Sequence, residues 1–197
     1  MRKWLGTICV ILGIACLLGA VGMVLYNRWE ADSARQTSHS LLEHVQLAIR
    51  EDVTRPAQSQ PGEADGAEMA AVRVEGYDCV GILSIPALEL ELPVLTDWSY
   101  TKLKKAPCLY YGSCYESDFV IAAHNYDAHF GRLSQLQVGD AVIFTDVNGT
   151  AHAYAVVLSE TLPKEATLEM IASGFDLSLY TCTPGGGNRD TVRCNRR

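Results

Sequence analysis

The chain has 197 residues, of which 48% are hydrophobic and 20% charged, and its formal net charge at pH 7 is −7. This length suits one globular domain with accessory segments, because a single core typically forms from about 100–150 residues. The composition is ordinary for a folded protein that carries one apolar segment. The excess of acidic over basic residues argues against a nucleic-acid partner, because nucleic-acid binding usually requires an excess or a patch of Lys and Arg.

The N-terminal region contains an uncharged apolar run of 23 residues, Trp4–Tyr26. A helix that rises ~1.5 Å per residue needs about 20 residues to cross the hydrocarbon core of a membrane. Basic residues precede the run, so the positive-inside rule places the N-terminus in the cytoplasm and everything beyond Asn27 outside. A cleaved signal peptide is the alternative, but its apolar region is usually shorter and ends in an A-x-A-like site. The sequence therefore predicts a cytoplasmic tip (residues 1–3) and a single-pass membrane anchor (residues 4–26).

A stalk is predicted between the anchor and the globular part. In residues 33–52, apolar side chains recur three or four positions apart, as in a helix with one apolar face. These side chains are Leu41, Leu42, Val45, Ala48 and Ile49. Residues 54–68 are rich in Pro, Gly and acidic residues, which indicates a flexible tether. Residues 27–73 are therefore expected to form a helical stalk and a flexible linker, with the helix packing on the domain or standing as a short stalk.

The remaining residues, 74–197, have the pattern of many short strands separated by turn residues. The expected strands are Val80–Ile85, Leu90–Leu95, Phe119–Ala123, Ala141–Phe144, Ala153–Leu158, Leu177–Thr181 and Asp190–Cys194. Asn148-Gly149 predicts a tight hairpin, because these residues supply the positive φ angles of such a turn. One short helix is expected at Lys164–Ala172. The pattern favours a mainly β fold, a small barrel or sandwich, in which closure removes exposed strand edges.

Cys182 is a candidate nucleophile. It ends an apolar strand and precedes Pro184-Gly185-Gly186-Gly187, which cannot continue a regular strand. A cysteine held by a scaffold beside a mobile loop suits catalysis, although a structural role is the commoner one for a single cysteine. The cysteines beyond the apolar run are Cys79, Cys108, Cys114, Cys182 and Cys194. Their odd number leaves at least one thiol unpaired.

His124 and Arg189 are its candidate partners. His124 follows the strand Phe119–Ala123, so two strands of one sheet could bring its imidazole to the thiol. An imidazole can stabilise a thiolate and later protonate a leaving amine. Arg189 stays charged and only donates hydrogen bonds, which suits an oxyanion or a substrate carbonyl. His129 is the weaker alternative to His124, and Arg193, otherwise expected to be solvated, is the alternative to Arg189.

These residues lie in segments that resemble the sortase family. Leu179-Tyr180-Thr181-Cys182, followed by an arginine at the start of the last strand, resembles the TLxTC…R signature of that family. Ser178 replaces the first Thr of the motif, and Ala123 replaces a commoner Thr or Gly before the histidine. The other similar segments are Gly81–Pro86 with Leu92–Val94 (the opening strands), Val120–Asn125 (the histidine strand) and Val138–Asp140 (the following turn). All occur in the family order between about Tyr77 and the C-terminus.

The resemblance implies a closed β-barrel cysteine transpeptidase in residues 74–197 that cleaves an LPxTG-like sorting signal. Cys182 would attack the Thr carbonyl of the signal to form a thioacyl intermediate, and His124 would protonate the leaving amine. Arg189 would hold the signal backbone and the oxyanion. The implied partners are surface or pilin proteins with sorting signals and an amine from a cell-wall precursor or a pilin lysine, at the outer membrane surface of a Gram-positive cell. No cofactor and no metal are implied.

The subclass and two other functions stay open. The N-terminal helix and the His124-Asn125 pair are similar to class B sortases, but the short connection from Leu158 to Leu177 is not. A hydrolytic cysteine protease would use water instead of an amine; papain-type enzymes place Cys before His, the reverse of this chain. A non-catalytic surface or metal-binding module would tolerate Cys182→Ala. Its ligands would be Cys79, Cys108, Cys114, Cys194 and His124.

Overall fold

The computed structural model of the protein describes residues 2–54 and 69–197. Two compact units, Met1–Ser33 and Ala34–Arg197, are distinguished by their internal contacts. The long helix α1 (Arg2–Thr54) contributes to both units, so the anchor and the stalk helix are one helix and not two. Most of the predicted flexible tether, residues 55–68, lies outside the described residues.

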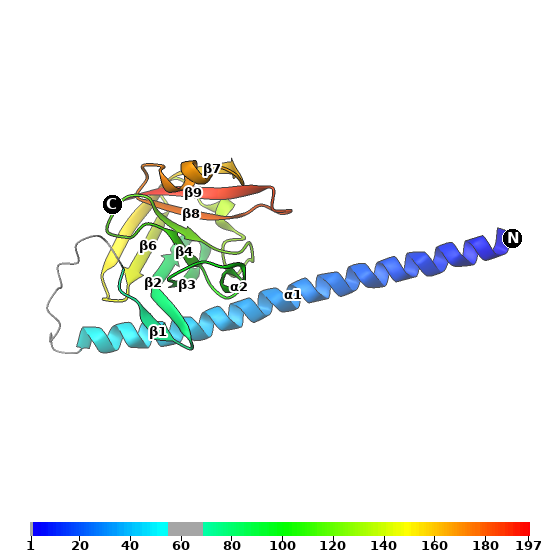
Figure 1. The fold of residues 1–197 in the computed structure, drawn as a ribbon, viewed down its shortest axis with the longest axis horizontal. Coiled ribbons are helices and arrows are strands. Elements are labelled where there is room, and N and C mark those ends of the chain that lie inside the picture. The colour runs from blue at the N-terminus through cyan, green and yellow to red at the C-terminus, as the bar shows by residue number, and fades with distance from the viewer. Residues whose placement is uncertain (1, 55–68) are drawn as a thin grey trace. The chain divides into compact units, whose positions relative to one another are not determined.

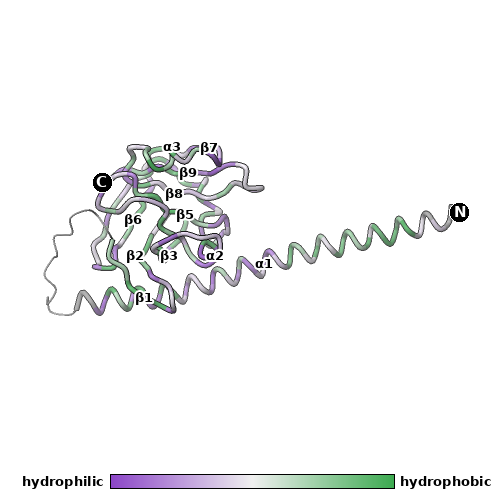
Figure 2. Tube along the Cα trace, viewed as in Figure 1, coloured by the Kyte–Doolittle hydropathy of each residue, from purple (hydrophilic) through white to green (hydrophobic). Residues whose placement is uncertain are grey.

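The N-terminal part of α1 is apolar along its length, and none of its most apolar residues is buried by the protein. Figure 2 shows this part mainly in green and white, whereas purple, white and green alternate in the remainder of the helix. Among the described residues, α1 is the one helix that is long and apolar enough to cross a membrane. An apolar helix surface with no protein over it requires an apolar environment. The membrane anchor predicted over residues 4–26 fits this requirement.

The C-terminal part of α1 packs on the domain through the apolar face that the sequence predicts. Leu41, Leu42 and Val45 are buried, and Ile49 is partly buried beside them. Their partners come from strands and loops on one side of the domain: Val74, Cys79, Ile82, Leu95, Ala106 and Cys108. This cluster, and not helix propensity alone, stabilises the segment, as is usual for amphipathic helices.

Nine strands form the domain. They are β1 (Val72–Val74), β2 (Tyr77–Ile85), β3 (Leu90–Leu95), β4 (Cys108–Tyr111), β5 (Phe119–Ala122), β6 (Ala141–Asp146), β7 (Ala151–Pro163), β8 (Leu177–Cys182) and β9 (Asn188–Arg196). Their order is β1-β2-β3-β4-β5-β8-β9-β7-β6, and a further pairing of β2 with β6 closes the sheet (Figure 1). The result is a closed barrel with β1 as an extra strand on β2. The predicted mainly β barrel is confirmed.

Gly81 makes the closure possible. It pairs with Val94 of β3 on one side and with Asp146 of β6 on the other. A Cβ atom at this position would lie 2.2 Å from the carbonyl oxygen of Thr145. Only glycine allows two backbones to approach so closely, so the seam of the barrel depends on it.

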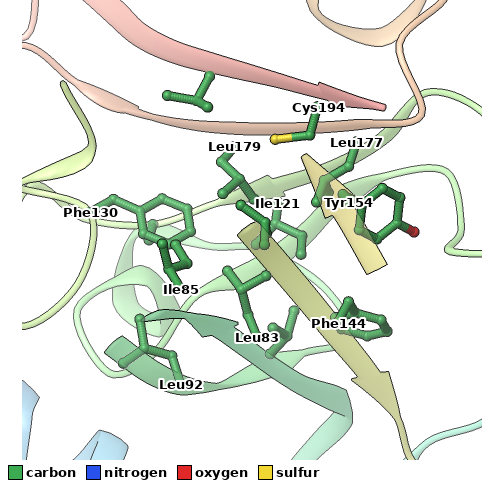
Figure 3. Close-up of a cluster of buried hydrophobic side chains, with 14 of the residues drawn as sticks. Leu83, Ile85, Leu92, Ile121, Phe130, Phe144, Tyr154, Leu177, Leu179 and Cys194 are labelled. Carbon is green, nitrogen blue, oxygen red and sulfur yellow. The ribbon is translucent and has the colours of Figure 1, made fainter. Parts of the chain in front are cut away.

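The core inside the barrel is built from alternate strand residues, as the two-residue period of a strand requires. Figure 3 shows Leu83 and Ile85 of β2, Ile121 of β5, and Leu177 and Leu179 of β8 converging in this core. Val192 and Cys194 of β9 belong to the same cluster. The intervening residues of β5, β8 and β9 therefore lie on the outer face of the barrel.

Apart from α1, the helices and 3-10 turns among the described residues are short. They are η1 (Pro86–Leu88), α2 (Tyr100–Leu103), η2 (Leu133–Gln135) and α3 (Thr167–Ile171). The helix predicted at Lys164–Ala172 is thus only α3, because β7 extends to Pro163 and pairs with β9 from Tyr154 to Pro163. The strands β1 and β4 and the helix α2 were not predicted.

The hairpin between β6 and β7 differs from the tight turn that Asn148-Gly149 suggests. Gly149 has a positive φ of 84°, but Asn148 does not. The carboxylate of Asp146 accepts hydrogen bonds from the backbone N–H groups of Asn148 and Thr150, at 3.0 and 2.9 Å. A three-residue loop in which only the glycine is left-handed is the next most common hairpin connection, and the Asp146 side chain selects it here.

Candidate active site

The ends of two parallel strands define the candidate site. β5 and β8 are neighbours, with Ala122 opposite Tyr180, and the N–H of Ala123 donates to the carbonyl of Tyr180 at 3.1 Å. His124 follows β5 by two residues, and Cys182 ends β8. Because the two strands are parallel, their C-terminal ends lie at the same end of the barrel, and both residues are found there. Strand alternation puts Cys182 on the outer face, because Leu177 and Leu179 of β8 point into the core.

Cys182 and Arg189 lie directly opposite each other across β8 and β9. Such cross-strand partners share one face of a sheet, with Cβ atoms about 4.5–5.5 Å apart. The Nη1 atom of Arg189 donates to the carbonyls of Gly186 and Asn188, at 3.2 and 3.0 Å. Its Nε and Nη2 atoms make no hydrogen bond to any described residue. The guanidinium therefore keeps donors for a ligand beside the thiol.

A groove of about 110 Å³ runs along the outer face and contains both residues. Ala122 and Cys182 belong to its lining, together with residues of the segment from Pro163 to Met170. The lining also includes an aromatic wall made of Trp98, Tyr110 and Tyr180. The Tyr110 ring centroid lies 5.6 Å from that of Trp98 and 5.3 Å from that of Tyr180.

Sequence reasoning missed the aromatic wall. Tyr110 belongs to β4 and Trp98 precedes α2, two elements too short to stand out in the hydrophobic pattern. The clustering of aromatic residues in Trp98-Ser99-Tyr100 and Tyr110-Tyr111 is the signal that could have found it, because aromatic side chains are enriched in ligand pockets.

Cys182 differs from the other cysteines of the domain in its exposure. All cysteines of the chain are free, and among those beyond α1 only Cys182 is partly exposed. The others are Cys79, Cys108, Cys114 and Cys194, and burial raises the pKa of each thiol to about 12. A buried thiol with such a pKa stays protonated and inert at neutral pH. Reactivity toward a substrate is therefore expected at Cys182 alone.

His124 is held by the loop that follows it. Its ring stacks on that of Tyr126, with centroids 4.0 Å apart and an interplanar angle of 14°. Its carbonyl accepts the N–H of Phe130, whose side chain is buried in the barrel core. Gly131 completes the turn, since a Cβ there would lie 2.7 Å from the carbonyl oxygen of Asn125. His124 stands beside the groove and does not belong to its lining.

His129 does not fit the role of an alternative base. It is fully buried, and neither ring nitrogen has a hydrogen-bond partner among the described residues. Burial, with a smaller contribution from nearby His124, lowers the pKa of His129 to about 4. The ring is therefore neutral at neutral pH and has no access to a substrate.

Arg193 is not solvated, contrary to the sequence prediction. It is only 2% exposed, and Nε donates to a carboxylate oxygen of Glu160 at 2.8 Å. Nη1 donates to the hydroxyl of Ser178 at 2.7 Å, and Nη2 donates to the carbonyl of Glu169 at 2.7 Å. All three of its nitrogens are thus occupied with structural contacts beneath α3. This leaves Arg189 as the arginine in the groove.

A larger hollow of about 500 Å³ lies elsewhere, between α1 and the loops that contain Glu89 and Arg132. None of Cys182, His124 and Arg189 lines it. Five of its eleven lining residues are charged, whereas most small-molecule pockets are lined mainly by apolar side chains. The groove at Cys182 is therefore the better candidate for the chemistry.

Comparisons with known proteins agree with this fold. The family model described as "Sortase domain" matches residues 83–196, which is more than half of the chain. Sortase A from Bacillus anthracis is 26% identical over 180 residues, covering 86% of this chain and 85% of the relative.

Solved structures show the same fold. A sortase D5 transpeptidase from Clostridium perfringens has a TM-score of 0.60 at 15% identity, covering 84% of this chain and 99% of that one. A sortase C from Clostridium perfringens, solved with the C-terminal cell wall sorting motif, has a TM-score of 0.55 at 20% identity. The match covers 81% of this chain and 88% of that one. The match to the family model over residues 83–196 shows that this chain belongs to the sortase family.

Proposed function

We propose that the chain is a membrane-anchored cysteine transpeptidase that acts on LPxTG-like sorting signals, with Cys182 as the nucleophile. The observation that carries the proposal is the exposure of Cys182 in a groove, with Arg189 directly opposite. The other thiols of the domain are buried and protonated. Membership of the sortase family supports transpeptidation of sorting signals as the reaction.

The proposed chemistry follows from the three side chains. The thiolate of Cys182 attacks the carbonyl carbon of the Thr in the sorting signal and forms a tetrahedral intermediate. Arg189 donates hydrogen bonds to the oxyanion or to the neighbouring signal backbone. Protonated His124 gives its proton to the leaving amine, and a thioacyl enzyme results. An incoming amine then attacks the thioester, loses a proton to His124 and releases the thiolate.

The groove supports an extended peptide with apolar residues as the substrate. Its wall of Trp98, Tyr110 and Tyr180 offers apolar surface. The Leu and Pro of an LPxTG-like signal would lie against this wall, upstream of the Thr at Cys182. The sorting motif present in the similar Clostridium perfringens sortase C favours the same class of ligand.

The long helix supports action at the membrane surface. Residues 4–26 would anchor the chain, with residues 1–3 in the cytoplasm and the catalytic domain, residues 74–197, outside the cell. Residues 27–73 would set its distance from the membrane. In this position the enzyme meets both exported proteins with sorting signals and the amine of a cell-wall precursor or a pilin lysine.

The test uses the full-length chain in detergent with a pool of sorting-signal peptides. Mass spectrometry should find a thioacyl adduct on Cys182 and, after an amine is added, a peptide joined to that amine. Cys182→Ala should fold and form no adduct. Cys194→Ala, which removes a buried thiol instead, is the matched control and should still react.

Two results would overturn the proposal. Substantial cleavage by purified Cys182→Ala would remove the nucleophile from the mechanism. Release of the acyl group to water only, with no transfer to any amine offered, would identify a hydrolytic cysteine protease instead.

A further inference from the structure

A cluster of three possible metal-ligating side chains lies away from the groove. Cys114 in the loop between β4 and β5, Asp146 at the end of β6 and His152 near the start of β7 each direct one ligand atom into it. These atoms all lie within 4.8 Å of one another. Pro163, at the opposite end of β7, lines the groove of Cys182, so the cluster lies at the other end of the barrel.

The distances between these ligand atoms are close to the distances between the ligands of a tetrahedral zinc ion. Oδ2 of Asp146 and Nε2 of His152 are 3.2 Å apart. Two ligands about 2.0–2.1 Å from one tetrahedral zinc ion are separated by roughly 3.3 Å, and a thiolate adds a bond of about 2.3 Å. Because the three atoms lie within 4.8 Å of one another, the sulfur of Cys114 has to move by roughly 1.4 Å at most to complete such a geometry.

The surroundings hold the ligands in place. Oδ1 of Asp146 accepts the N–H groups of Asn148 and Thr150, which turns Oδ2 toward the cluster. The hydroxyl of Tyr115 donates to Oδ2 at 3.1 Å, and its ring packs edge-on against His152. Outer contacts of this kind orient metal ligands in known sites.

Burial and charge also suit a divalent cation. Cys114 is fully buried and Asp146 is 2% exposed, whereas the His152 side chain is 15% exposed and offers a path from solvent. A thiolate and a carboxylate carry two negative charges, which a divalent cation neutralises. Without such a partner a buried charge is costly.

We propose that Cys114, Asp146 and His152 form a structural zinc site whose fourth ligand is water or the Tyr115 hydroxyl. On binding, Zn²⁺ replaces the thiol proton of Cys114, which leaves to solvent, and takes the lone pair of Nε2 on the neutral His152 ring. The ion joins the β4–β5 loop to the β6–β7 hairpin. Of the ligands suggested by the sequence for a metal-binding module, only Cys114 takes part, and the site departs from the expectation that no metal is bound.

The test is spectroscopic and uses full-length protein in detergent, stripped with a chelator. A Cys182→Ala background removes the exposed thiol of the groove. Added Co²⁺ should give thiolate-to-cobalt charge transfer and the intense visible bands of tetrahedral cobalt, at one ion per chain. Zn²⁺ should displace these bands and raise the melting temperature.

Variants locate the ion. Cys114→Ser should abolish the charge-transfer band, and His152→Gln should weaken Zn²⁺ binding at least about tenfold. Cys194→Ser, which changes another fully buried thiol of the same core cluster, should retain the band. Circular dichroism in chelator shows whether each variant folds, and His152→Gln decides the question if Cys114→Ser does not.

The proposal fails if the parent protein gives no thiolate band. It also fails if the band survives both Cys114→Ser and His152→Gln. None of these readouts depends on acylation at Cys182, so the site is tested separately from the proposed function.

Discussion

Arg189 and Arg193, both in β9, allow an effect on stability to be separated from an effect on activity. Arg193 donates to Glu160, to Ser178 and to a backbone carbonyl under α3. Arg193→Met removes all three contacts, and Arg193→Lys retains at most one of them, because an ammonium lacks the planar fork. Breaking a buried ion pair by removing one partner costs about 3–5 kcal/mol. The Glu160 side chain is 31% exposed, which lowers the expected cost to about 3 kcal/mol.

That free energy corresponds to a fall in melting temperature of roughly 6–12 °C for a chain of this size. Arg189 should behave in the opposite way. Its present contacts are to exposed loop carbonyls, so Arg189→Lys and Arg189→Ala should change the free energy of unfolding by less than about 0.5 kcal/mol. If Arg189 holds the oxyanion, both variants should lower the acylation rate by about 10²–10³.

The assay combines thermal unfolding with single-turnover acylation, measured below the melting temperature of every variant. Arg193→Lys should melt early and acylate at a near-normal rate, while Arg189→Lys should do the reverse. A large loss of acylation in folded Arg193→Lys, with near-normal rates in Arg189→Lys, would refute the assignment. Small and equal losses in both would mean that backbone N–H groups near Cys182 supply the oxyanion contacts.

Three further predictions concern the rest of the chain. Burial lowers the pKa of His129 from 6.5 to about 4. Between these two pH values the unfolded chain therefore binds more protons than the folded protein does. The free energy of unfolding should therefore fall by about 3 kcal/mol from pH 7 to pH 4, and urea titrations of His129→Phe should lack this fall. Gly81→Ala should melt far lower than the parent in calorimetry, because its Cβ meets a backbone oxygen, whereas Gly187→Ala, with open space around it, should not. Protease added to intact protoplasts should digest the chain beyond Asn27; a protected domain would reverse the predicted topology.

Most of the barrel could be predicted because its strands are amphipathic in the two-residue period. β3, β5 and β8 agree with the predicted segments to within one residue. Short elements were missed because they contain too few residues to show this period. β4 has four residues between a proline and a glycine, too few for a periodic signal, and it carries Tyr110 of the groove wall.

The burial of the charged Arg193 side chain could not be predicted from the sequence either. The run Arg193-Cys194-Asn195-Arg196-Arg197 has the composition of a solvated terminus, and basic residues are usually exposed. Arg193 is buried because Glu160 and Ser178, 33 and 15 residues earlier in the chain, supply its partners. Such pairings depend on which strands become neighbours, and the local pattern contains no information about that.

The length of one loop decides which arginine faces Cys182. In the register of β8 and β9, Cys182 pairs with Arg189 and Ser178 pairs with Arg193. The turn that sets this register is closed by the N–H of Thr183, which donates to the carbonyl of Asn188 at 3.1 Å. The N–H of Asn188 donates back to the Thr183 hydroxyl, also at 3.1 Å. A shift of one residue would turn the Arg189 side chain to the interior face of the sheet. The glycine-rich segment after Cys182 therefore does more than leave the groove accessible: its length places a guanidinium beside the thiol.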